Sequence, residues 1–265
     1  MSTNTTIEWT DATWNPVRGC TKISTGCTHC YAERFAERFR GVEGHPYQQG
    51  FDLKLIPEKL GDPLRWTKSK MVFVNSMSDL FHKDVPDDYI LQVVRVMQLA
   101  NWHTFQVLTK RAERMAEMLA GPLRKFAGYR NIWWGVSVEN RKHGLPRMEL
   151  LRSSPAVMKI LSVEPLLEDL GEINLQGINW VIAGGESGPG ARVMRKEWVT
   201  RLRDQCAKES VPFFFKQWGG TNKAKLGRLL EGRTHDDVPA RTVSEPPSRQ
   251  RRLELIRETE MDTNS

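Results

Sequence analysis

The sequence predicts an α/β protein built as a partial (β/α) barrel of parallel strands. Short apolar, β-rich runs recur along the chain, and helix-like stretches separate them. Several of the runs are apolar throughout, as expected of parallel strands that are covered on both faces. The expected strands are Met71 to Val74, Thr104 to Leu108, Ile132 to Val138, Met158 to Val163, Trp180 to Ala183 and Pro212 to Phe215.

The N-terminal elements complete this series. We expect a first strand just before Cys20 and a helix at Tyr31 to Phe39, which brings the total to about seven strands and favours an open or partial barrel. The stretch from Asp87 to Ala100 places apolar residues on one helical face and begins with acidic residues after Pro86. Further helices are expected at Arg111 to Leu119, at Arg141 to Arg152, with Pro146 interrupting it, and at Lys196 to Glu209.

Each expected strand stops at polar or ionisable residues. In barrels of this type the reactive groups sit where the carboxyl ends of the strands converge. A strand that simply ends in a polar loop would look the same, but here the feature recurs at six strands. These residues are Asn75, Ser76, Ser78 and Asp79, then Thr109 to Arg111, Glu139 and Asn140, Glu164, Gly184 to Ser187, and Lys216 to Trp218.

The composition changes near the C-terminus. We expect residues 1–239 to form the barrel domain and residues 240–265 to form a disordered or partly helical tail, with a short helix at Arg249 to Glu260. The chain of 265 residues has 39 Lys and Arg against 32 Asp and Glu, a net charge of +7. The tail is neutral, so the positive charge belongs to the folded part.

The chain carries no sign of a membrane or secretory segment. No apolar run approaches the roughly 18 residues of a spanning helix, and the N-terminal residues lack the basic start and apolar stretch of a signal peptide. We therefore expect a cytoplasmic protein with no membrane partner. Thiols stay reduced in that compartment, so clustered cysteines there indicate a metal site or catalysis.

Three of the four cysteines lie within eleven residues. Cys20, Cys27 and Cys30 have the spacing Cys-x6-Cys-x2-Cys, between an expected strand and an expected helix. Thiolates select iron–sulfur clusters or zinc, and a [4Fe-4S] cluster held by three thiolates keeps one iron open for a ligand. Zinc would need a fourth ligand, and the six-residue gap fits poorly with structural zinc sites. A site without metal is the third interpretation. Candidate fourth ligands for zinc are His29, His45, His82 and Cys206.

The cysteine segment resembles the three-cysteine loop of the radical S-adenosylmethionine (SAM) superfamily. The segments CTKISTGCTHCYAERF, FVNSMSDLFH, VLTKR, WWGVSVEN, LSVEPLL, VIAGGESG and FFFKQWG together resemble a phage- and prophage-associated three-Cys-motif branch of it. The first gap is six residues here, where the superfamily usually has three. The resemblance implies a TIM-barrel-like partial barrel in which Cys20, Cys27 and Cys30 bind a [4Fe-4S] cluster. It also implies that SAM chelates the open iron and is cleaved reductively to start radical chemistry.

The same resemblance suggests residues that contact SAM. His29 takes the place of the aromatic residue that usually packs near the adenine. Ser76, Ser78 and Asp79 follow the strand whose loop usually receives the amino group, although Asp79 could equally be a helix N-cap. Ser137 and Glu139 take positions that often contact the SAM carboxylate or ribose. Glu164, at the next strand end, joins this set of expected cofactor-binding residues.

The run from Gly184 to Arg192 suggests a further ligand contact. Its glycines let backbone N–H groups approach a ligand, and Glu186 could accept from ribose hydroxyls or an amino group. A plain turn is the alternative interpretation. The run lacks the GxGxxG order of a dinucleotide-binding loop.

The substrate is expected to be a macromolecule. The basic charge, with Lys and Arg near the strand ends, and the pairs Trp133-Trp134 and Gln217-Trp218 as stacking surfaces, would suit DNA modification or repair. A partner protein is the competing substrate, and an electron-donor protein is a further expected partner. The alternative function is a zinc- or cluster-stabilised nucleic-acid-binding module without catalysis.

Overall fold

The computed structural model describes residues 5, 7–221, 226–241 and 243–262. Residues 1–4 and 263–265, at the ends of the expected domain and tail, lie outside the described residues. The strands are β1 Ala12–Trp14, β2 Val17–Arg18, β3 Lys54–Leu55, β4 Met71–Val74, β5 Thr104–Thr109, β6 Ile132–Ser137, β7 Lys159–Val163, β8 Trp180–Gly184 and β9 Phe213–Gln217. The α-helices are α1 Tyr31–Glu37, α2 Asp62–Arg65, α3 Asp87–Leu99, α4 Ala112–Ala120, α5 Arg141–Ser153, α6 Lys196–Lys208 and α8 Arg249–Asp262.

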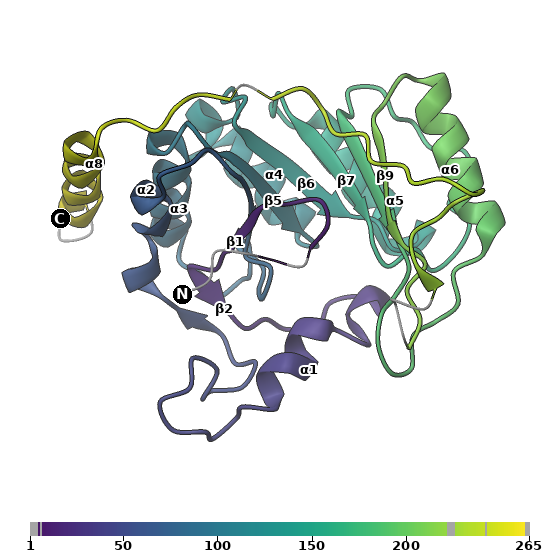
Figure 1. Ribbon diagram of the computed structural model, residues 1–265, viewed down its shortest axis with the longest axis horizontal. Coiled ribbons are helices and arrows are strands. Elements are labelled where there is room, and N and C mark those ends of the chain that lie inside the picture. The colour runs from purple at the N-terminus through teal and green to yellow at the C-terminus, as the bar shows by residue number, and fades with distance from the viewer. Residues whose placement is uncertain (1–4, 6, 222–225, 242, 263–265) are drawn as a thin grey trace.

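Within these residues, seven strands form one parallel sheet in the order β1-β4-β5-β6-β7-β8-β9. The sheet curls into a half-barrel, and β1 and β9 are its two edges (Figure 1). The expected α/β class and partial barrel are thereby confirmed. In the described part of the chain, no helix is both long enough and apolar enough to span a membrane.

The strand that enters the sheet at the N-terminus lies further from Cys20 than expected. It ends at Trp14, and the short β2 between it and Cys20 pairs antiparallel with β3 in a separate two-stranded sheet. This happens because Val17 and Arg18 leave the edge of the barrel and lead into residues 19–30. These residues carry the three clustered cysteines and form the cysteine loop. A second difference concerns α5, which continues through Pro146. Its N-cap Asn140 accepts from His143 N at 2.9 Å, and packing against the sheet outweighs the missing N–H of Pro146.

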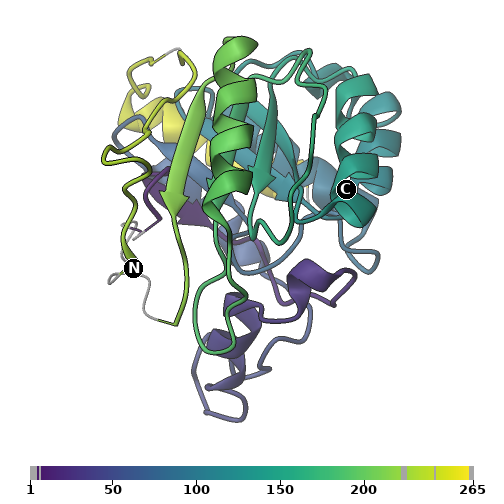
Figure 2. The ribbon, with the colours of Figure 1, turned by 90° about the vertical axis from the view of Figure 1, so that its right-hand side faces the viewer.

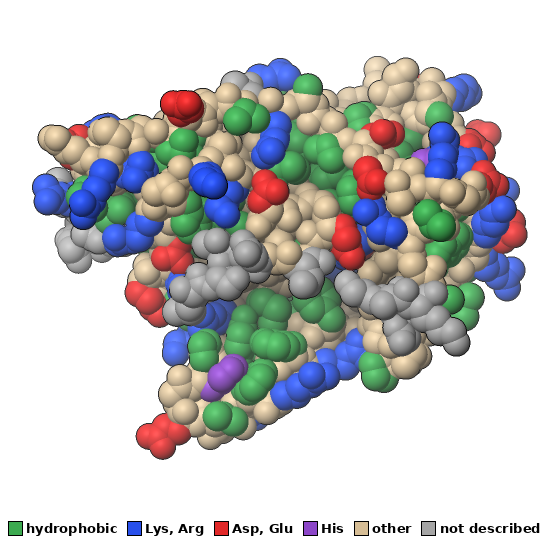
Figure 3. Space-filling view, viewed as in Figure 1, with side chains coloured by type: hydrophobic (Ala, Val, Ile, Leu, Met, Phe, Trp, Pro, Cys, Tyr) green, Lys and Arg blue, Asp and Glu red, His purple; other side chains and the backbone are tan. Residues whose placement is uncertain are grey.

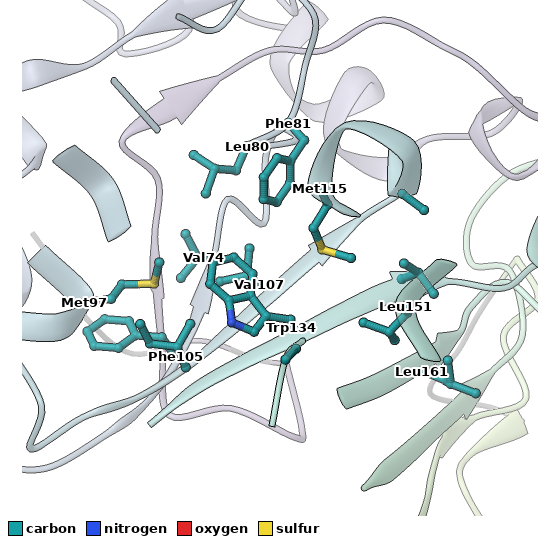
Figure 4. Close-up of a cluster of buried hydrophobic side chains, with 14 of the residues drawn as sticks. Val74, Leu80, Phe81, Met97, Phe105, Val107, Met115, Trp134, Leu151 and Leu161 are labelled. Carbon is teal, nitrogen blue, oxygen red and sulfur yellow. The ribbon is translucent and has the colours of Figure 1, made fainter. Parts of the chain in front are cut away.

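The outer face of the sheet carries the main core. Alternate strand residues, such as Phe105 and Val107 of β5 and Trp134 of β6, are buried against helix residues, such as Met97 of α3 and Met115 of α4 (Figure 4). Figure 2 shows α6 and its neighbouring helices lying across the strands on this side. The helices therefore hold the strands rigid from outside and leave the inner face free for a cavity.

The inner face changes character along the strands. Near the amino ends, Trp133, Trp180 and Phe214 form a second buried cluster with Trp9, a residue of the N-terminal segment. Near the carboxyl ends, most of the inner side chains are small, polar or charged. Because the sheet is covered on both faces, Trp133 and Trp134 are both in the core. The expectation that this pair offers a stacking surface was wrong.

The segment after residue 239 contains a helix that packs on the domain. Helix α8 lies against α2 and α3, and its Leu255 and Ile256 are buried in the outer core. Between β9 and α8, residues 226–241 and 243–248 lead toward the opposite edge of the sheet (Figure 1). The helix expected at Arg249 to Glu260 is therefore present at Arg249–Asp262.

Candidate functional site

The cysteine loop is fixed at the carboxyl end of the barrel by its own backbone. Cys20 N donates to Phe51 O at 3.2 Å, and Gly19 N donates to Met77 O at 3.1 Å. Gly19 has a φ of 78°, and a Cβ there would lie 2.2 Å from Asp52 O. Only glycine fits this position, so Gly19 sets the direction in which the loop leaves β2.

The three clustered thiols share one cavity of about 460 Å³ at the carboxyl ends of the strands. The thiols of Cys20, Cys27 and Cys30 are all free. In the described residues, no three His, Cys, Asp or Glu side chains form a group suited to a single metal ion. A [4Fe-4S] cluster needs a wider arrangement, because each thiolate binds a different iron. The predicted residues that line the cavity are Cys20, Cys27, Cys30, His29, Ser76, Ser78, Asp79, Ser137, Glu164 and Glu186.

Asp79 and Arg111 form an ion pair that touches the cysteine loop. Asp79 accepts from Thr109 Oγ1 at 2.7 Å, and its Oδ2 lies 2.9 Å from Arg111 Nη1. That guanidinium is 3.4 Å from Cys20 Sγ and also donates to Thr21 O at 3.0 Å. Asp79 also accepts from Phe81 N, two residues ahead, so it closes a turn and is not a helix N-cap. The Asp79 carboxylate therefore positions Arg111 against the first cysteine.

The pKa of the Cys20 thiol reflects these surroundings. Burial, and then the nearby Asp79 carboxylate, raise the pKa of Cys20 to about 11, although the Arg111 guanidinium acts in the lowering direction. Burial likewise raises the pKa of Cys30. Both shifts favour the protonated thiol in the metal-free protein, and binding a metal would release those protons.

Glu139 does not line the cavity, although the sequence placed it among the cofactor contacts. Its fully buried carboxylate forms an ion pair with Arg147 of α5 at 2.6 Å, and it accepts a hydrogen bond from the hydroxyl of Ser24 in the cysteine loop. Burial acts to raise the pKa of Glu139, but Lys110, Ser24 and Arg147 together hold it below its usual value. This residue thus ties the cysteine loop to the barrel.

Glu186 also holds the cysteine loop in place, through Arg192. Its carboxylate accepts from Arg192 Nε at 2.9 Å and from Arg192 N at 3.0 Å, within the Gly184 to Arg192 run. Arg192 Nη2 in turn donates to Thr25 O of the cysteine loop at 3.0 Å. Three predicted carboxylates thus hold the cysteine loop: Glu139 contacts it directly, whereas Asp79 and Glu186 each act through an arginine.

The serines and His29 have smaller contacts. Ser76 donates to Asn15 Oδ1 at 3.2 Å, and Ser78 donates to Val17 O at 2.7 Å. Ser137 lines the cavity from the end of β6, and His29 lines it beside Gly190. The cavity wall therefore mixes an imidazole with hydroxyl groups close to the thiols.

The sequence alone does not identify the side chains that hold the cysteine loop. Arg111 and Arg192 were recognisable only as basic residues near strand ends, and Ser24 carried no signal at all. The contacts Arg111–Asp79, Ser24–Glu139 and Arg192–Thr25 join residues 32, 115 and 167 positions apart, so only the fold shows that they meet. Cys206 is buried in α6, and burial raises its pKa to about 12, as expected of an inert thiol.

The fold and site define an α/β protein with an open parallel barrel and a three-thiol cavity at its carboxyl rim. The chain belongs to the family described as "Protein of unknown function (DUF5131)", whose model matches residues 4–239. None of the curated proteins compared with the chain matches it. A solved structure of a spore photoproduct lyase mutant is similar in shape, with a TM-score of 0.47 and 10% identity over 78% of this chain and 75% of that chain.

Proposed function

We propose that the protein is an iron–sulfur enzyme of the radical SAM type. Cys20, Cys27 and Cys30 would hold a [4Fe-4S] cluster, and SAM would bind beside it. The observation that carries the proposal is that three free thiols line one cavity at the carboxyl ends of parallel strands. A cavity of about 460 Å³ is within the range of cofactor sites, which is roughly 300–1,000 Å³.

The residues around the thiols fit this group. Iron ligands must be thiolates, and although burial and Asp79 raise the pKa of Cys20, the Arg111 guanidinium beside its Sγ acts in the lowering direction. His29, Ser76, Ser78 and Ser137 offer an aromatic ring and hydroxyls to the adenosyl and amino-acid parts of SAM. A bound, reduced cluster would supply the electron that cleaves SAM. Asp79, Glu139 and Glu186 keep the loop in place.

We further propose a macromolecular substrate, with nucleic acid favoured over a partner protein. Lys110 and Arg111 bring positive charge to the cavity wall of a chain that is basic overall. Hydrophobic side chains are exposed over the lobe of α1 and the loop after it, including Tyr31, Phe35 and Val42 (Figure 3). Such a patch beside a cavity suits a large partner. An electron-donor protein and a cytoplasmic location belong to the same proposal.

The experiment is anaerobic reconstitution with iron and sulfide, followed by reduction in the presence of SAM. We expect bound iron and release of methionine and 5′-deoxyadenosine. Cys27→Ala should lose both, while Cys206→Ala, which changes a thiol far from the cavity, should keep both. Full iron content in Cys27→Ala would contradict the ligand assignment.

The same measurement separates the two candidate functions. Tightly bound zinc without SAM cleavage would favour a nucleic-acid-binding module in which the thiols only stabilise the fold.

A further inference from the structure

A bulge in β9 aims two neighbouring side chains into the cavity. The register between β8 and β9 shifts, so that Ala183 pairs with Phe215 but Gly184 pairs with Gln217. Lys216 is the extra residue, and both Lys216 and Gln217 line the cavity. In a regular strand, successive side chains would point to opposite faces. Bulges of this kind commonly re-aim a side chain beside a binding site.

Glu164, at the end of β7, meets this bulge. Its Oε2 lies 3.1 Å from Lys216 Nζ, so the ion pair neutralises its charge. Its Oε1 is shielded from water and has no hydrogen-bond partner among the described residues. A Cβ at Gly184 would lie 2.9 Å from this oxygen, so the glycine leaves the space that Glu164 occupies.

Gln217 presents a second acceptor without a partner. Its Nε2 donates to Gly185 O at 3.4 Å and to the hydroxyl of Ser187, and because a carbonyl only accepts, these contacts identify which atom of the amide is the nitrogen and which is the oxygen. Gln217 Oε1 is buried and unpaired within the described part of the chain. A buried acceptor without a donor destabilises the ligand-free state, and the broad terminal torsions of Glu and Gln let both oxygens turn toward a ligand.

We propose that Lys216, Glu164 and Gln217 form a subsite for the Watson–Crick edge of a guanine-type base. That edge presents one acceptor, O6, followed by two donors, the N1–H and the 2-amino group. The subsite offers the complement: the Lys216 ammonium as donor, then Glu164 Oε1 and Gln217 Oε1 as acceptors.

The other bases lack this pattern. Adenine offers one donor beside a ring acceptor, cytosine one donor beside two acceptors, and uracil or thymine one donor between two acceptors. An ammonium ligand would prefer an unneutralised carboxylate, whereas Glu164 is already paired with Lys216. The apolar part of the cavity wall, with Trp9, Phe73 and Leu108, suits the faces of a flat ring.

This inference rests on the proposed function, because it names the substrate class for the same cavity. It moves Glu164 from the expected cofactor contacts to the substrate. Its test requires no SAM cleavage, so the two proposals can fail separately. Guanine discrimination without SAM cleavage would support the subsite and contradict the radical mechanism. SAM cleavage without guanine discrimination would support the radical mechanism and contradict the subsite.

The test is calorimetric titration of the anaerobically purified full chain with 5′-GMP, 5′-IMP and 5′-AMP at one salt concentration. IMP lacks only the 2-amino group, so we expect it to bind about tenfold more weakly than GMP, and AMP more weakly still. Gln217→Leu should remove the difference between GMP and IMP. Glu164→Gln should weaken GMP by about tenfold. Glu172→Gln, in a separate surface groove, is the matched control and should bind as wild type.

Equal affinity of the wild type for GMP and IMP would overturn the subsite, as would unchanged GMP binding by Glu164→Gln. Circular dichroism checks that each variant folds, and Lys216→Met, which removes the donor for O6, serves as a second variant. Short oligothymidines with one central guanine or inosine form a second arm of the test. Discrimination only in the oligonucleotides would assign the base to a nucleic acid, and discrimination only in the mononucleotides would assign it to a free nucleotide.

Discussion

Arg147→Met tests whether Glu139 is an anchor of the cysteine loop. Arg147 and Glu139 have side chains that are 6% and 0% exposed, and their charged atoms are 2.6 Å apart. Removing Arg147 leaves the Glu139 carboxylate buried without its partner charge. Breaking a buried pair in this way destabilises a protein by about 3–5 kcal/mol. We therefore expect the free energy of unfolding to fall by about that amount.

The assay is urea denaturation at neutral pH, with the midpoint and slope compared between variants. Arg152→Met is the matched control on the same helix, because its partner Glu149 is 58% exposed and the pair is 3.4 Å apart. An exposed pair of this kind contributes about 0–1 kcal/mol. If the free energy of unfolding of Arg147→Met lies within about 1 kcal/mol of the wild-type value, as expected for Arg152→Met, then Glu139 does not anchor the cysteine loop. Iron loading should also fall in Arg147→Met, since Ser24 connects Glu139 to the cysteine loop.

Two further predictions concern stability. Burial lowers the pKa of His103 to about 4, while an unfolded histidine titrates near 6.5, so the unfolded chain binds more protons between these values. The contribution of His103 to stability should therefore be fully present above about pH 6.5. As the pH falls from 7 to 5, loss of this contribution should lower the free energy of unfolding by about 2 kcal/mol. His103→Gln should reduce that pH dependence in urea titrations, and an identical dependence in both proteins would refute the assignment. Leu255→Ala should lower stability by about 2 kcal/mol or more, whereas the exposed Leu253→Ala should have little effect; equal midpoints would show that α8 contributes nothing.

Much of the fold could be predicted from the sequence because its signals are local. The apolar runs gave strand positions to within one or two residues, as at β4 and β8, since continuous apolar segments occur where both faces of a sheet are covered. The same periodicity could not show that Val17 and Arg18 leave the sheet. That departure depends on pairing with β3, more than thirty residues further along the chain.

The candidate site was less accessible to sequence reasoning. Spacing alone grouped Cys20, Cys27 and Cys30, and the structure places them around one cavity. The partners of the carboxylates could not be read in the same way, because Ser24 and Glu139 meet only through the folded chain. The bulge at Lys216 likewise has no sequence signature, since it is a property of how β8 and β9 pair.

The position of α8 has a consequence for the order in which the chain folds during synthesis. Its partners α2 and α3 belong to the first hundred residues, whereas Leu255 and Ile256 are made after every strand of the sheet. The faces of α2 and α3 that these side chains cover stay exposed until translation has passed residue 256. A nascent chain paused before that point therefore presents an apolar surface to chaperones, and contacts of such long sequence separation form late.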